Sequence, residues 1–195
     1  MNDRLLPPSF YDQPTLELAR ALLGKKLVHQ TEEGRVSGYI VETEAYMGPK
    51  DQAAHSFNNR RTPRTEIMFG ANGSVYTYVM HTHCLVNVVS GGEGFPEAIL
   101  IRAVEPIEGI ETMYKRRIKA KRDQDLTSGP GKLTQALGIT KADYGRRFFE
   151  SPLYIAEGRP VEEISEGPRI GIDNSGEAKD YPWRFWETGN RFISR

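Results

Sequence analysis

Alternating apolar and polar positions run through most of this chain, and they predict short β-strands joined by polar turns. Leucines at helical spacing between residues 16 and 23, stopped by Gly24, predict a helix, and two more helices are expected at residues 105–122 and 132–137. The strands are expected at residues 26–29, 36–44, 74–80, 85–89, 98–103, 153–156, 168–172 and 183–188. Together these elements predict a single α+β domain, spanning residues 1–195, with a curved antiparallel β-sheet core surrounded by helices.

The segment Val41–Met47, Val-Glu-Thr-Glu-Ala-Tyr-Met, carries the most informative polar residues. A strand repeats every two residues, so one face would hold Ile40, Glu42, Glu44 and Tyr46, and residues 41, 43 and 45 would take the other. Carboxylates are uncommon on an apolar strand unless they are paired or perform chemistry, and one beside an aromatic ring suits a general base. An exposed edge strand with two solvated acids is the competing interpretation. The Cα separation of roughly 6.6 Å also overlaps the carboxyl spacing of inverting glycosidases.

Composition and length limit the number of domains, the kind of partner and the cellular compartment. A length of 195 residues fits one domain. The 26 Lys and Arg balance 26 Asp and Glu, which argues against capture of partners by overall charge but leaves room for a local basic groove. The single cysteine, Cys84, excludes an internal disulfide and favours a reducing compartment. Because no apolar run approaches the roughly 18 residues of a membrane span and the first residues lack a secretory signal, we expect a cytoplasmic protein with no membrane partner. No oligomerisation signal is visible, so we expect a monomer.

A long polar loop is expected at residues 47–65, and loops of that length inside a compact domain tend to be functional. It holds His55 and three arginines, Arg60, Arg61 and Arg64. Arginine and asparagine side chains in a loop can bind phosphates and base edges. A solvated loop is the plainer interpretation.

Tyr76, Tyr78 and Met80 share one face of the strand at residues 74–80. Aromatic residues on a strand usually belong to the core, but they also stack on nucleobases, a contact worth about 1–3 kcal/mol per base. His81 and His83 form a His-x-His motif near the following turn. A metal would need further ligands, and the sequence supplies no matching set of carboxylates or cysteines, so we expect no metal site.

Two further segments could contact phosphate groups. Residues 115–122 hold six Lys or Arg in eight positions; these would either end the expected helix, where cations offset its dipole, or contact phosphates. The Gly129–Lys132 run, Gly-Pro-Gly-Lys, lacks the Walker spacing of a P-loop. It could still present backbone N–H groups to a phosphate at a helix start.

Several short motifs are spread in order over nearly the whole chain. They are Val41-Glu-Thr-Glu-Ala-Tyr46, Ala53-Ala-His-Ser56, Arg61-Thr-Pro-Arg64, Met68-Phe69, Val75-Tyr-Thr-Tyr78, Leu100-Ile-Arg-Ala103, Ser128-Gly-Pro-Gly-Lys-Leu133 and Arg169-Ile-Gly-Ile172. In this set the chain closely resembles the bacterial branch of the alkyladenine (3-methyladenine) DNA glycosylase family. The first motif and the Ser-Gly-Pro-x-Lys-Leu motif are the most specific.

The resemblance implies a monofunctional DNA glycosylase of base-excision repair. Such an enzyme flips a damaged purine out of double-stranded DNA and hydrolyses its N-glycosidic bond, leaving an abasic site. The damaged purines implied are 3-methyladenine, hypoxanthine, ethenoadenine and 7-methylguanine. No metal or organic cofactor is implied, and the protein would lie in the bacterial cytoplasm, on the nucleoid through its DNA.

The resemblance also assigns roles to residues of this chain. Glu44 falls on the catalytic acid, which positions and deprotonates the attacking water, and Arg102 falls on the arginine near that water. Asn87 falls on the asparagine that discriminates against the guanine amino group. The residues of the base pocket would be Tyr46, His55, Tyr78, Asn87 and Leu100.

DNA contacts are expected from a protruding β-hairpin formed by the strands at residues 74–80 and 85–89. Vertebrate members of the family wedge a tyrosine from the hairpin tip into the space that the base leaves. This chain is one residue shorter there, so either Met80 or His81 takes the wedge position. The residues expected on the DNA backbone are Arg60, Arg61, Arg64 and Lys132.

Two other classes of protein are alternatives. A non-catalytic nucleic-acid-binding module on a related fold would use the same basic and aromatic groups without needing Glu44. A carbohydrate hydrolase would use Glu42 and Glu44 as its acid and base. Near-neutral charge mildly favours the sugar interpretation, but the arginine loop and the family motifs outweigh it.

Overall fold

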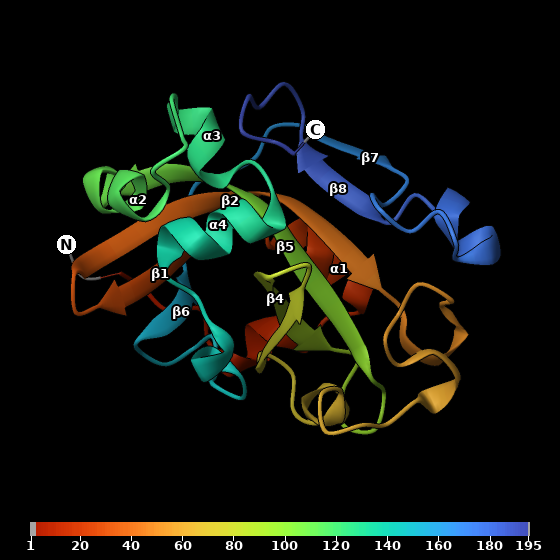
Figure 1. Ribbon diagram of the computed structural model, residues 1–195. Coiled ribbons are helices and arrows are strands. Elements are labelled where there is room, and N and C mark those ends of the chain that lie inside the picture. The colour runs from red at the N-terminus through yellow and green to blue at the C-terminus, as the bar shows by residue number, and fades with distance from the viewer. Residues whose placement is uncertain (1–2, 195) are drawn as a thin grey trace.

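Eight strands form one curled antiparallel sheet in the computed structural model, which describes residues 3–194 (Figure 1). The strand order is β3-β4-β5-β2-β1-β6, and β8 pairs with β2 and carries β7. This sheet, with helices around it, confirms the predicted single α+β domain. The strands are β1 (Lys26–Thr31), β2 (Gly34–Tyr46), β3 (Val75–Met80), β4 (His83–Ser90), β5 (Glu97–Glu108), β6 (Leu153–Ala156), β7 (Ile164–Gly167) and β8 (Arg184–Glu187).

The helices are short and lie against the sheet (Figure 1). Leu18 from α1, and Leu133 and Leu137 from α4, enter one buried apolar cluster with side chains of β5 such as Ile101; Leu22, directly after α1, joins them. Among the described residues, no helix has the length and apolar character needed to cross a membrane. The α-helices are α1 (Thr15–Ala21), α2 (Ile110–Arg116), α3 (Asp123–Thr127) and α4 (Pro130–Leu137). Single 3₁₀ turns are η1 (Pro8–Tyr11), η2 (Gly48–Lys50), η3 (Phe57–Asn59), η4 (Glu66–Phe69), η5 (Lys141–Asp143) and η6 (Gly176–Asp180).

Strand β2 lies inside the sheet, paired with β1, β5 and β8. Its ladder with β5 contains two neighbouring bulges, in which Val41 is an extra residue on β2 and Arg102 an extra residue on β5. A bulge breaks the strict alternation of side chains. Ile40 therefore joins the main core, while Val41 packs against Phe192. The expectation that Ile40 shares a face with Glu42 is wrong, although the alternation holds from residue 42 to residue 46.

One row of side chains crosses four strands of the sheet. Tyr76 on β3 is opposite Asn87 on β4, Asn87 is opposite Leu100 on β5, and Leu100 is opposite Glu44 on β2. Residues directly opposite one another on neighbouring strands share a face. The sheet therefore brings together residues that are far apart in the sequence.

The hairpin of β3 and β4 ends in a two-residue turn, His81-Thr82. Both turn residues have positive φ, 48° and 77°, as a tight hairpin of this type requires, and the value is rare for β-branched threonine. Beside the turn, Val79 is 47% and Met80 48% exposed. The hairpin thus ends in an exposed polar turn, and two exposed apolar side chains precede it on β3.

The helix expected at residues 105–122 is wrong at both ends. Residues as far as Glu108 continue β5, because their backbone pairs with β2. Gly109 then adopts a φ of 74°, which turns the chain into α2, and α2 ends at Arg116. The remaining basic residues, up to 122, lie outside any helix, so the helix dipole does not explain them.

The strand expected at residues 168–172 is also wrong, since the strand in this region is β7. The polar groups of this segment bond to other parts of the chain instead of to a neighbouring strand. The backbone N–H of Ile170 donates to Glu44 at 2.7 Å, and the Arg169 guanidinium donates to Asp51. The other expected strands are present, with boundaries that differ by a few residues.

Replacing Gly109 by alanine is expected to destabilise the fold. The added Cβ would lie 2.6 Å from both the backbone oxygen of Arg35 and a side-chain methyl of Val36, on a backbone whose φ is 74°. We expect the free energy of unfolding to fall by about 2–4 kcal/mol, seen as a lower urea midpoint at unchanged slope.

The matched control is Gly92→Ala. Gly92 has a φ of 90°, but no atom lies within 4 Å of the added Cβ. It should therefore lose only about 1 kcal/mol, from backbone strain alone. Equal losses in the two variants would contradict the clash at Gly109.

Candidate active site

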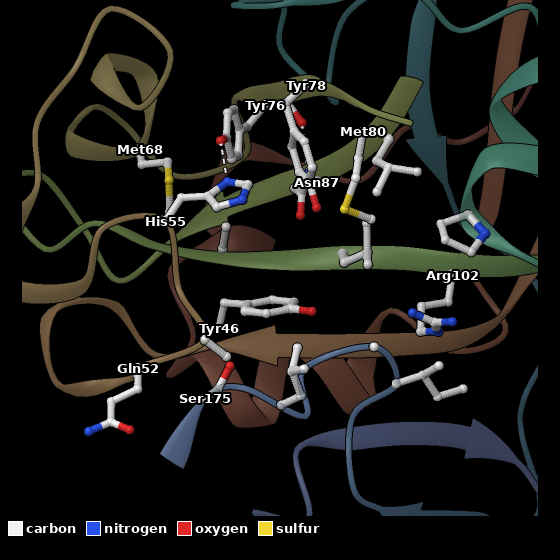
Figure 2. Close-up of a pocket in the computed structure, with 18 of the residues that line it drawn as sticks. Tyr46, Gln52, His55, Met68, Tyr76, Tyr78, Met80, Asn87, Arg102 and Ser175 are labelled. Atoms are coloured by element: carbon white, nitrogen blue, oxygen red, sulfur yellow. Dashed lines mark hydrogen bonds between the residues drawn. The ribbon is translucent and has the colours of Figure 1, made fainter. Parts of the chain in front are cut away.

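A cavity of about 310 Å³ opens beside the row of side chains that crosses the sheet (Figure 2). Its volume lies at the lower end of the range of small-molecule sites, roughly 300–1,000 Å³. Its walls come from the sheet, from the loop that follows β2 and from residues 170–175. The predicted site residues that line it are Tyr46, His55, Tyr78, Met80, Asn87, Leu100 and Arg102.

Glu44 lies directly behind the cavity wall and has no exposed surface. Its Oε1 accepts the backbone N–H of Ile170 at 2.7 Å, and its Oε2 accepts the Tyr46 hydroxyl at 2.9 Å. Arg102 Nη1 is 3.2 Å from the same Oε2. All three partners line the cavity. Because a carboxylate offers about four acceptor positions, these contacts leave about one for a further donor.

Burial and hydrogen bonding shift the pKa of Glu44 in opposite directions. Burial raises the pKa of Glu44 above its ordinary value, and the nearby Glu42 charge adds to this. The Arg102 charge, the Ile170 amide and the Tyr46 hydroxyl lower that pKa without cancelling the effect of burial. A carboxylate with a raised pKa next to a cavity is typical of a general acid or base.

Glu42 is equally buried, and like Glu44 it does not itself line the cavity; of its partners in the described part of the chain, only Arg102 does. Its carboxylate accepts the backbone N–H of Ser194 at 2.6 Å and the Ser194 hydroxyl at 2.8 Å. Arg184 also donates to it, at 3.1 Å. The interpretation of β2 as an edge strand with two solvated acids is therefore wrong, because both acids are buried and bonded.

Arg102 links the two carboxylates. Its Nε is 3.4 Å from Glu42 Oε1, and its Nη1 faces Glu44. Arg102 is only 7% exposed, and its place in the β5 bulge sets it between the two acids. A buried carboxylate stays ionised only beside such a cation. Arg102 therefore stabilises the ionised form of Glu44.

Aromatic rings form two opposite walls of the cavity. In Figure 2, Tyr46 lies on one side, and His55, Tyr76 and Tyr78 lie on the other. His55 Nδ1 is hydrogen-bonded to the Tyr76 hydroxyl at 2.8 Å, and the His55 and Tyr78 ring centroids are 4.5 Å apart at 78°. The sequence predicted the shared face of Tyr76 and Tyr78, but it did not assign Tyr76 to the site.

These walls are uncharged near neutral pH. Burial lowers the pKa of His55 to about 4, with smaller effects from the positive charges of Arg64 and Arg60. Burial likewise raises the pKa of Tyr78 to about 12. These aromatic walls can therefore accept an aromatic ring, neutral or cationic, without charge repulsion from His55 or Tyr78.

A buried ion pair that the sequence analysis missed supports the cavity from behind. Arg169 donates to Asp51 through both terminal nitrogens, at 2.5 Å and 2.8 Å, and both side chains are fully buried. The guanidinium also lies 4.7 Å from the Tyr46 ring centroid. Arg169 belongs to the Arg169–Ile172 motif, but its partner Asp51 is 118 residues away in the sequence. No local pattern therefore predicts the pairing.

None of the residues predicted to contact the DNA backbone lines the cavity. All four are exposed: Arg60, Arg61, Arg64 and Lys132. Arg61 pairs with Glu66 at 2.5 Å, which offsets its charge. Lys132 lines a second cavity of about 350 Å³, which also contains Arg102 and Ser194.

The remaining candidate groups have simple surroundings. His81 and His83 lie at the exposed hairpin tip, and neither lines the main cavity. Within residues 3–194, no group of three or more His, Cys, Asp or Glu side chains is arranged to hold a metal ion. In the basic segment, Arg116 and Arg117 bond within the chain, to Glu33 and to Gln135, while its lysines are exposed.

Comparisons with known proteins identify the family of this chain. A family model described as "Methylpurine-DNA glycosylase (MPG)" matches residues 9–191. Proteins named "Putative 3-methyladenine DNA glycosylase" are similar over their length: that of Bacillus licheniformis is 65% identical over 190 residues, covering 97% of this chain and 96% of its own. That of Bacillus subtilis is 64% identical with the same coverage, and that of Oceanobacillus iheyensis is 58% identical over 194 residues, covering 100% and 98%. The chain therefore belongs to the methylpurine-DNA glycosylase family.

Membership of this family confirms the resemblance inferred from the sequence motifs. It also confirms the class of enzyme, a DNA glycosylase, which hydrolyses N-glycosyl bonds. DNA is accordingly the macromolecule on which the enzyme acts. The alternatives of a non-catalytic module and of a carbohydrate hydrolase do not fit this membership.

The His55 ring is expected to remain neutral far below the ordinary pKa of histidine. In an NMR titration its signals should move with a midpoint near 4 instead of near 6.5. Because the unfolded chain takes up this proton first, the free energy of unfolding should fall as the pH drops from about 6.5 toward 4. His55→Gln identifies the signals and should remove this part of the pH dependence. A midpoint near 6.5 would contradict the burial of the ring.

Proposed function

We propose that this enzyme removes alkylated and deaminated purines from double-stranded DNA: 3-methyladenine, 7-methylguanine, hypoxanthine and ethenoadenine. It acts as a monomer whose whole chain is one glycosylase domain, and it leaves an abasic site. One observation carries the proposal, namely that the buried Glu44 lies behind an aromatic cavity and is held by three groups that line it. The name of the Bacillus relatives, which mentions 3-methyladenine, supports the same substrate class.

Alkylated purines need little catalytic machinery. The N-glycosidic bond of a normal nucleotide is stable because an anionic purine leaves poorly. Alkylation at N3 or N7 puts positive charge on the base, which then departs neutral. The enzyme has to place a water next to the anomeric carbon and stabilise the oxocarbenium-like transition state with a carboxylate. For hypoxanthine, a pocket group or a water must also protonate the leaving base.

Glu44 is the proposed general base. The water oxygen bonds to the anomeric carbon as the carbon–nitrogen bond breaks, the bonding electrons leave with the base, and the water proton passes to Glu44. The acceptor position that Ile170, Tyr46 and Arg102 leave open would receive this water. Arg102, also proposed to act at this centre, keeps the carboxylate ionised and oriented.

Recognition of the base is assigned to the aromatic walls. A base inside a duplex cannot enter a cavity, so the nucleotide has to be flipped out, and damaged pairs cost less to open. Tyr46 on one side, and His55 and Tyr78 on the other, would stack against or contact the flipped ring. Cation–π attraction favours positively charged rings, and His55, with a pKa of about 4, does not repel them at neutral pH.

Asn87 is the proposed discriminator against guanine. It is 3% exposed, and its Nδ2 donates to the backbone oxygen of Tyr76 at 3.1 Å, which fixes the amide at the cavity wall. A rigid side chain there would collide with the 2-amino group of guanine. Leu100, directly opposite on β5, supplies an apolar neighbour.

The exposed hairpin tip is the proposed wedge. Met80 belongs both to the cavity wall and to the tip, whereas His81 belongs only to the turn. Either side chain could fill the space that the base leaves, and Met80 is the better placed. The DNA backbone would then pass the exposed cations of the loop and of α4, which are Arg60, Arg61, Arg64 and Lys132.

Glu44→Gln is expected to abolish excision while DNA binding is retained. The amide has the shape of the acid but cannot accept a proton, so single-turnover release of hypoxanthine or ethenoadenine should fall by about 10²–10⁴-fold. Glu111→Gln, at an exposed acid on α2, is the control and should keep the wild-type rate. Full excision by Glu44→Gln would refute the assignment of the base.

Asn87→Ser is expected to relax the discrimination against guanine. The smaller side chain leaves room for the 2-amino group, so the rate of guanine release relative to hypoxanthine release should rise by about tenfold. Single-turnover rates on duplexes carrying either base measure this ratio. If the ratio were unchanged, Asn87 would have no part in the selection.

A further inference from the structure

The segment that follows β8 folds back against the part of β2 that carries Glu42. Phe192 is 4% exposed and packs on Val41 and Ala103. This packing brings Ser194 to the Glu42 carboxylate, where it is 7% exposed. The two residues are 152 positions apart in the sequence, so no local motif reveals their contact.

Ser194 is hydrogen-bonded in both directions. Its backbone N–H donates to Glu42 Oε2 at 2.6 Å, and its hydroxyl donates to Glu42 Oε1 at 2.8 Å. The same hydroxyl oxygen accepts from Arg102, from Nε at 3.3 Å and from Nη2 at 3.2 Å. A hydroxyl has one donor and two acceptor positions, so this serine uses its full capacity in joining an acid to an arginine.

These contacts fix the Arg102 guanidinium by one edge. Nε and Nη2 face Ser194, which leaves Nη1 to face Glu44 at 3.2 Å. Arg184 on β8 pairs with Glu42, so Glu42 has a cation of its own besides Arg102. The arrangement therefore holds the arginine in place for Glu44.

We propose that Ser194 is a positioning residue for base excision, which holds Arg102 in the orientation that Glu44 requires. The inference rests on the proposed function, in which Glu44 takes the proton of the attacking water. Ser194 does not line the cavity for the base, and it lines the second cavity together with Arg102. It thus acts through Arg102 and does not touch the base.

A positioning role predicts a change in proton affinity. The groups that act on Glu44 are Arg102 from β5, the Ile170 amide, and Tyr46 and Glu42 from β2, with Tyr78 facing it from β3. Of these, Arg102 is the one that Ser194 holds. Without the hydroxyl the guanidinium loses the contact that holds its Nε and Nη2 edge, so it can shift away from Glu44 and the Glu44 pKa rises. Because only ionised Glu44 can accept a proton, the acidic limb of the pH–rate profile then moves to higher pH.

The test compares Ser194→Ala with Ser194→Thr and with a matched control, Ser165→Ala on β7. The control removes a hydroxyl that contacts Thr188 and no group of the site. Single-turnover base release from hypoxanthine and ethenoadenine duplexes is measured from about pH 5 to about pH 9, with the melting temperature of each variant alongside. Ser194→Ala should lose about tenfold in rate near the acidic limb, the value of one hydrogen bond to a charged group. Ser194→Thr should restore both rate and limb, and the control should match the wild type.

A second readout does not depend on the substrate. Carbon-13 NMR of the side-chain carboxyl carbons, with Glu44→Gln to assign the signal, follows the titration of Glu44 directly. The midpoint should be higher in Ser194→Ala than in the wild type and the control. An unshifted midpoint, or a uniform loss of rate and melting temperature with no movement of the limb, would overturn the positioning role. Absence of base release from the wild type, with a shifted midpoint in Ser194→Ala, would refute the proposed substrates and leave the link between Ser194 and Glu44 standing.

Discussion

Two carboxylates on one interior strand cannot stay ionised without cations beside them. Glu42 and Glu44 have no exposed surface, and an uncompensated buried charge costs several kcal/mol. Arg102 contacts both acids, and Arg184 contacts Glu42. The site of this glycosylase is organised around that pairing, because the acid behind the cavity depends on it. The burial that raises the proton affinity of Glu44 would otherwise neutralise it altogether.

The sheet delivers this pairing by departing from regularity. In an unbroken ladder, each side chain has a fixed partner on the neighbouring strand. Here the extra residue on β5 is Arg102 itself, and the extra residue on β2 is Val41. The two bulges compensate each other, so the register is the same on either side of them. The strands keep their pairing on either side of the two bulges, while one arginine is placed between two acids of the same strand.

How much of this could be predicted depends on whether the signal is local. The two-residue period of a strand predicted that Glu44 shares a face with Tyr46, and Tyr78 with Met80. The family motifs predicted Arg102 as a site residue. The pairs Asp51–Arg169 and Glu42–Ser194 join residues more than a hundred positions apart, and they exist only once the chain has folded. The helix expected at residues 105–122 failed for a related reason. The end of β5 has its partner on β2, and only pairing with that strand decides its conformation.

The strand order β3-β4-β5-β2 separates the acid from much of the aromatic wall of the cavity. Glu44 is on an interior strand, whereas Tyr76, Tyr78 and Met80 are on β3, the last strand of the sheet. Outer strands open locally at lower free-energy cost than inner ones. The part of the cavity wall on β3 can therefore open locally, or change its shape through substitutions, while the Glu44–Arg102 pair stays in place. Such a division lets the range of accepted ligands diverge among relatives without rebuilding the chemistry.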